Sequence, residues 1–267
     1  MLISKVIHKK FFALGLCLGL APLGAGNNGG YFALGFQYSN MGAGGSANST
    51  FLSNESDTAT TNATSGNLFG GDVQLGYRQF FGKKKRFGMR YYAMFSAQGG
   101  HYSYPQNYFA PDDSTHVYVI RNGALANLFY GAGWDMLLDF YQSDTRSFGI
   151  FGGVMLGGTS WLLGGSDGAC RADRYNLDTG DLACGPTGQS YAQMAKQLGK
   201  LASYSPSYVQ FAFNFGVRAN VSKHNGLEVG VRAPVINTPY FVHKGDPIAS
   251  LHFRRMIVLF ANYVVNF

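Results

Sequence analysis

Apolar and polar residues alternate along the last segment of the chain, residues 253–267. Counting back by twos, one face is entirely apolar over six positions: Phe267, Val265, Tyr263, Ala261, Leu259 and Ile257. The other face turns polar toward its end, with Asn262 and Asn266. Because successive side chains of a strand point to opposite faces, the pattern predicts a strand with one face in an apolar medium. Its edge needs a partner to avoid aggregation, either in a closed barrel or in a soluble sheet.

Seven earlier segments alternate in the same way. They are 31–39, 69–81, 87–99, 127–141, 147–156, 208–221 and 227–235. Strands of about 9–11 residues suit a tilted membrane strand. The glycine-rich segment 147–156 leaves its own register open, with Phe148, Ile150, Val154 and Leu156 expected on the apolar face.

The connections between these eight segments alternate in length. Three are short and polar, at 82–86, 142–146 and 222–226, and four are long, at about 40–68, 100–126, 157–207 and 236–252. Short periplasmic turns and long extracellular loops are typical of outer-membrane barrels. The pattern therefore predicts an all-β fold: an eight-stranded antiparallel transmembrane β-barrel over residues 26–267, with both termini in the periplasm.

Composition favours the same fold class. The chain has 267 residues and is 46% hydrophobic but only 13% charged, against about 25% charged in average soluble domains. No internal run of 18 apolar residues occurs, which argues against a helical membrane protein. Membrane barrels combine these properties because their apolar residues alternate with polar ones.

Residues 1–25 resemble a secretory signal peptide. Lys5, Lys9 and Lys10 precede an apolar run at 11–20, and small residues at 24–25 offer a cleavage site. These lysines supply three of the seven net positive charges, so +4 remains after cleavage. That modest charge gives no reason to expect a nucleic-acid partner.

Two cysteines, Cys170 and Cys184, remain after export. An even number in an oxidising compartment predicts one disulfide, worth about 3 kcal/mol for a loop of this length in the chain-entropy model. A metal site is the alternative, but no histidine lies between them. Further along, Tyr191, Met194, Ala195, Leu198 and Leu201 have helical spacing, which predicts a short amphipathic helix at 188–201 packed on the loop or the barrel rim.

Nine charged residues are expected to face the lumen. They are Asp72, Asp135, Asp139 and Glu228 with Arg78, Arg90, Arg218, Arg232 and Arg254. An eight-stranded barrel is just wide enough for side chains to fill, so a paired structural network is expected. The alternative is a narrow channel whose selectivity these charges set. No convincing Ser-His-Asp arrangement is evident, so we expect no enzymatic activity, cofactor or metal.

Several ordered motifs resemble those of the Helicobacter outer membrane protein family (the Hop, Hor and Hof groups). They are GYRQFFGKKKRFGMRYY at 76–92, LFYGAGWD at 128–135, FGIFGG at 148–153, GLEVGV at 226–231 and RRMIVLFANYVVNF at 254–267. The resemblance implies a surface-exposed outer-membrane barrel, with adhesion or porin activity in some members. The large adhesin members carry a long insertion after the first strand, whereas this connection is only 40–68.

Two functions follow from the fold and the resemblance. The first is a structural and interaction role, adhesin-like, in which the loops contact a host-surface or envelope partner. The second is a small-solute porin. In either case the barrel is embedded in outer-membrane lipid.

The end of the last strand resembles the signal that the barrel-assembly machinery recognises, through Phe267, Val265, Tyr263 and Leu259. We predict that deleting Phe267 impairs assembly but leaves export intact. Surface labelling and periplasmic fractionation of cells producing the variant measure the two steps separately. Normal surface accumulation of the variant would contradict the membrane-barrel prediction.

Overall fold

The computed structural model describes residues 28–48, 58–59, 64–109, 116–143, 145–164, 172–175, 182–184, 191–245 and 249–267. The signal peptide expected at 1–25 lies outside these ranges. Within them, no helix has the length and apolar character needed to cross a membrane.

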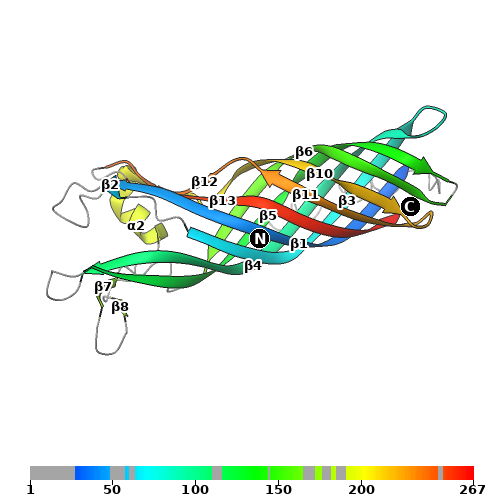
Figure 1. The fold of residues 1–267 in the computed structure, drawn as a ribbon. Coiled ribbons are helices and arrows are strands. Elements are labelled where there is room, and N and C mark those ends of the chain that lie inside the picture. The colour runs from blue at the N-terminus through cyan, green and yellow to red at the C-terminus, as the bar shows by residue number, and fades with distance from the viewer. Residues whose placement is uncertain are drawn as a thin grey trace, which may run out of the picture.

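Eight long strands form a closed ring (Figure 1). They are β1 (Gly29–Asn48), β3 (Thr64–Phe81), β4 (Phe87–Phe109), β5 (His116–Gln142), β6 (Ser147–Leu163), β10 (Ser207–Asn220), β11 (Asn225–Pro234) and β13 (Ala249–Asn266). Each pairs antiparallel with the next, and β13 returns to pair with β1. The predicted eight-stranded antiparallel barrel is confirmed.

The closing seam joins the first and last strands of the ring. Tyr31 of β1 is paired with Asn266 of β13, and the register continues through Tyr38 and Leu259. The backbone N–H of Phe267 adds a hydrogen bond of 3.0 Å to the carbonyl of Gly30. The strand that ends the chain therefore has the partner expected from the sequence.

The outer wall is apolar, as the alternation predicted. In β1, Leu34 and Phe36 are each 58% exposed, whereas Ala33 before them and Gln37 after them are fully buried. The same alternation runs around the ring and leaves a band of large apolar side chains with no protein covering. Such a surface needs lipid around it.

The glycine-rich strand β6 takes the register that its apolar residues suggested. Phe148 and Ile150 face outward, and Phe151 and Met155 are buried inside. The pairing of β6 with β5 and β10 therefore determines which face of β6 points outward, a question that the sequence pattern left open.

The strands run further than predicted into the ranges expected as loops. Pairing of β3 with β4 continues to Ser65 and Ser103, although the outward face of β4 changes from Phe95 to the polar His101 and Ser103. Backbone pairing does not need lipid, so the sheet continues where the apolar alternation stops. The strands thus occupy the edges of the ranges expected as loops, at about 40–68, 100–126, 157–207 and 236–252.

Smaller elements gather at the long-loop end (Figure 1). They are β2 (Thr58–Ala59), β7 (Ala172–Tyr175), β8 (Leu182–Cys184), α2 (Tyr191–Leu198), the 3₁₀ turn η2 (Gly199–Leu201), β9 (Ala202–Tyr204) and β12 (Thr238–His243). The helix expected at 188–201 is present as α2. Cys184 ends the small hairpin β7–β8, but Cys170 lies outside the described residues, so the disulfide stays a prediction.

Introducing a charge into the outer band tests its lipid contact. Val229 is 55% exposed in the middle of β11, and we predict that Val229→Arg lowers the free energy of unfolding in lipid vesicles by about 2–4 kcal/mol. Ser103→Arg, outward-facing beyond the apolar band, is the matched control and should change it by less than about 0.5 kcal/mol. Equal effects of the two substitutions on the free energy of unfolding would contradict the lipid contact of the outer band.

Candidate functional site

The centre of the lumen is organised by Arg90, which is 3% exposed. Its Nε donates to Asp135 Oδ2 at 2.7 Å, and its Nη1 donates to both carboxylate oxygens of Glu228 at 2.6 and 2.8 Å. These residues come from β4, β5 and β11, and β4 and β11 lie on opposite sides of the ring. One guanidinium therefore ties opposite walls of the barrel together.

Neutral groups complete the environment of Asp135. Asn214 Nδ2 donates to Asp135 Oδ2 at 3.1 Å and to the Tyr92 hydroxyl at 2.9 Å, and that hydroxyl donates in turn to Asp135 Oδ1 at 3.4 Å. The Arg90 guanidinium carbon lies 4.3 Å from the centroid of the Phe151 ring. A buried charge is tolerated when it is paired and hydrogen-bonded, and Asp135 meets both conditions.

A second ion pair joins β11 to β3. Arg232 Nη1 donates to Asp72 Oδ2 at 3.1 Å, and Asp72 also accepts hydrogen bonds from the side-chain amides of Gln37 and Gln74. The Arg232 guanidinium lies over Phe260, 3.8 Å from the ring centroid. This pair is held by the same combination of charge, amide and aromatic contacts as the first.

Two of the remaining three predicted arginines are held more loosely. Arg218 Nη1 lies 3.8 Å from Asp139 Oδ1. Arg78 lies 6.0 Å from the centroid of the Tyr31 ring, and no described carboxylate comes within 4.0 Å of it. Eight of the nine residues predicted for the lumen are thus buried there.

The ninth, Arg254, was predicted on the wrong face. Its side chain is partly exposed, and its Nη2 contacts Met256 Sδ at 3.4 Å. Arg255 faces the lumen instead, is 5% exposed and donates to Gln98 Oε1 at 3.2 Å. The β1–β13 register shifts at Met41, leaving Met256 as an extra residue, and such a bulge exchanges the two faces of a strand.

Large and small side chains interlock to fill the space between the charges. A Cβ at Gly133 would lie 2.2 Å from Tyr92 Cζ, and one at Gly216 would lie 2.5 Å from Phe151 Cζ. Tyr92 and Phe151 therefore lie directly over glycines on neighbouring strands. The lumen at this level is packed with side chains.

An aromatic plug lies at the long-loop end of the lumen. We use this name for the buried cluster Met41, Ala43, Leu68, Tyr102, Leu125, Trp161, Tyr240, Phe241 and Phe253. Within it, Trp161 stacks on Phe253 with ring centroids 5.4 Å apart, and Tyr240 meets Phe253 edge-on at 5.0 Å. The Trp161 indole N–H donates to Thr238 Oγ1 at 3.2 Å.

Helix α2 and strand β9 pack against the aromatic plug. Tyr191 of α2 packs on Phe241 and Tyr240, with centroids 5.3 and 5.9 Å apart. The hydroxyls of Tyr204 and Tyr240 lie 3.3 Å apart. Burial and this hydrogen bond raise the pKa of Tyr240, so it stays a neutral phenol.

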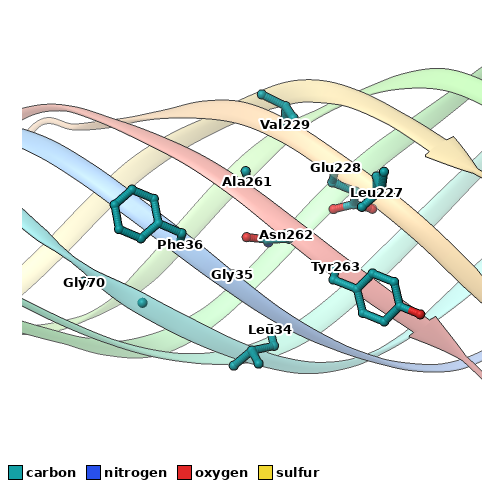
Figure 2. Close-up of a pocket in the computed structure, with 11 residues that line it drawn as sticks. Leu34, Gly35, Phe36, Gly70, Leu227, Glu228, Val229, Ala261, Asn262 and Tyr263 are labelled. Atoms are coloured by element: carbon teal, nitrogen blue, oxygen red, sulfur yellow. The ribbon is translucent and has the colours of Figure 1, made fainter.

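A surface hollow lies on the outer wall of the barrel. It is a groove of about 730 Å³ where β1, β3, β11 and β13 meet. Figure 2 shows Leu34, Phe36 and Tyr263 projecting from the strands around it. The outward side chains are apolar, so this groove faces lipid. Among the described residues, no three His, Cys, Asp or Glu side chains are grouped to hold a metal ion.

The sequence matches the family model described as Helicobacter outer membrane protein over residues 72–267. This chain belongs to that family. The match begins at Asp72 within β3 and includes every later strand of the barrel. This member of the Helicobacter outer membrane protein family is therefore an outer-membrane protein.

Solved structures with a similar architecture are distant in sequence. OprG from Pseudomonas aeruginosa has 10% identity and a TM-score of 0.47, covering 91% of this chain and 98% of its own. Neisserial surface protein A has 15% identity and a TM-score of 0.35, covering 88% and 99%. Ail of Yersinia pestis has 12% identity and a TM-score of 0.27, also covering 88% and 99%. A comparison with curated proteins finds no match.

The sequence analysis missed the aromatic plug. Its members come from six barrel strands and β12, and in the sequence they stand in segments taken as loops or strand ends. Tyr102, Trp161 and Tyr240 stand outside the eight alternating segments, so the period-two signal did not mark them. Only pairing of the strands past the apolar band brings them together.

Removing Arg90 would leave two buried carboxylates without their cation. We predict that Arg90→Met in this family member lowers the free energy of unfolding by about 3–5 kcal/mol. The triple variant Arg90→Met, Asp135→Asn, Glu228→Gln should recover most of the loss, because neither of the two carboxylates that Arg90 compensated is then charged. Denaturant titration in lipid vesicles measures the free energy of unfolding of both variants. An equal loss in the triple variant would show that the shape of these side chains, more than their charge, stabilises the lumen.

Proposed function

We propose that this outer-membrane protein is a sealed barrel that presents its long-loop end to a host-surface or envelope partner. The observation that carries the proposal is the double closure of the lumen. A charged network joins its walls, and the aromatic plug lies across its long-loop end. A solute would have to disrupt both to pass.

The short turns are assigned to the periplasm and the long-loop end to the cell exterior. This follows the loop-length asymmetry of outer-membrane barrels. At the long-loop end, β4 and β5 continue to Phe109 and His116, past the polar His101 and Ser103. The sheet thereby extends above the membrane as a ready surface for contact.

A small-solute pore is the second candidate, and one observation favours it. Five buried arginines, now including Arg255, face four carboxylates, which leaves one positive charge in excess. An unbalanced cation in a lumen is the device that gives anion selectivity to channels.

Planar-bilayer recording distinguishes the two functions. We expect folded wild-type protein to give no discrete conductance steps. A variant with a Gly-Ser linker in place of 191–201 should also give no conductance steps, because the network below the plug still fills the lumen.

A cell-binding assay tests the contact role. A strain whose barrel lacks the 104–121 tip should lose binding to its target cells while the barrel still assembles.

Discrete steps from correctly folded wild type would overturn the sealed barrel. In that case the pore interpretation predicts a second result. Neutralising Arg232 or Arg218 would have to change the ion selectivity of those steps.

A further inference from the structure

Strands β4 and β5 pair with each other beyond the reach of their neighbours. The last β3–β4 pair is Ser65 with Ser103, and the last β5–β6 pair is Leu125 with Leu163. Pairing within β4–β5 continues to Phe109 and His116. Residues 104–109 and 116–124 thus form a two-stranded ribbon at the long-loop end (Figure 1), whose outer edges pair with no strand in the described part of the chain.

Backbone hydrogen bonds define which residues of β5 point to its outer edge. The carbonyl of Ala124 accepts from Gly164 N, on the β6 side, at 2.8 Å. The N–H of Asp139 donates to Arg86 O, on the β4 side, at 2.8 Å. Because backbone direction alternates along a strand, the even-numbered Tyr118 and Ile120 direct their N–H and C=O groups away from β4.

The two edges of the ribbon differ in their protection. Pro105 stands opposite Ile120. Proline has no N–H to donate, and natural sheets place it on edges to discourage further pairing. On the β5 side, residues 117–120 read Val-Tyr-Val-Ile, which are strong strand formers without a proline or a charge among them. Proline blocks the β4 edge, whereas no strand of the described residues pairs with the β5 edge.

We propose that the β5 edge at Tyr118 and Ile120 binds an extended segment of a partner protein as an added strand. Main-chain hydrogen bonds supply the affinity in this mode of recognition. The segment would be free of proline and rich in β-branched or aromatic residues, matching 117–120. This inference rests on the proposed function, for which it supplies the way the partner is held.

A foreign segment fits this edge better than a second copy of the chain. Two copies in one membrane, related by an axis normal to it, bring their β5 strands together in parallel, because the ribbon runs along the barrel (Figure 1). Parallel pairing is the less stable arrangement, and parallel strands cannot be joined through a simple turn. A partner peptide is free to run antiparallel.

Amide hydrogen exchange of the full-length protein in lipid nanodiscs tests the edge. The probe is a ten-residue capped peptide of alternating Thr and Val. Without the probe, the N–H groups of Tyr118 and Ile120 should exchange about tenfold faster than those of Val117 and Val119, which bond to β4. Saturating probe should slow exchange at the two even-numbered residues only.

Two substitutions at one position supply the control. Ile120→Pro removes an outward N–H without breaking the ladder to β4, and it should weaken probe binding about tenfold. Ile120→Thr keeps the N–H and should bind as wild type does. Unchanged protection of Val119 verifies that the ribbon persists, and Tyr118→Pro replaces Ile120→Pro if it does not.

Three outcomes would overturn the inference: Tyr118 and Ile120 already protected without probe, no added protection at saturating probe, or equal binding by the Pro and Thr variants. None of them depends on conductance. Conductance steps would instead overturn the sealed barrel and leave the exchange pattern at the β5 edge as it is.

Discussion

The structure depends on one constraint: a backbone inside lipid has no water with which to form hydrogen bonds. Every N–H and C=O of a spanning strand must be paired within the protein, and a sheet can do this only by closing. The seam between β1 and β13 meets this requirement, with Tyr31 opposite Asn266 and the register maintained past Tyr38. The apolar outer face and the alternation along every strand follow from that closure.

Closure with only eight strands in turn determines the inside. The ring is too narrow for a wide aqueous channel, so inward charges lie close together and must be compensated. Arg90 lies between Asp135 and Glu228, and Arg232 is paired with Asp72. Aromatic rings lie over glycines between these pairs, as Tyr92 does over Gly133. The lumen thereby stabilises the barrel as a soluble protein's core would.

Beyond the membrane the constraint is relaxed, and the strands take on other roles. The outward face of β4 becomes polar at His101 while its pairing continues. Inward aromatics such as Trp161 and Phe253 can then meet across the end of the barrel. Unpaired backbone also becomes permissible there, because water can satisfy it. The β5 edge at Tyr118 and Ile120 can exist only in that region, which is where contact with another protein would occur.

The sequence by itself determined the eight strands, their faces, their order and eight of the nine lumen charges. Each of these follows from a period-two pattern that the lipid boundary imposes on every spanning strand. Tertiary structure alone decided that Arg255, not Arg254, faces inward, because a bulge at Met256 depends on the register with β1. Tertiary structure also decided that the aromatic plug forms. Its members, including Tyr102 and Tyr240, lie far apart in the chain. Contacts between distant segments leave no periodic trace in a sequence, because they arise only when the ring has closed.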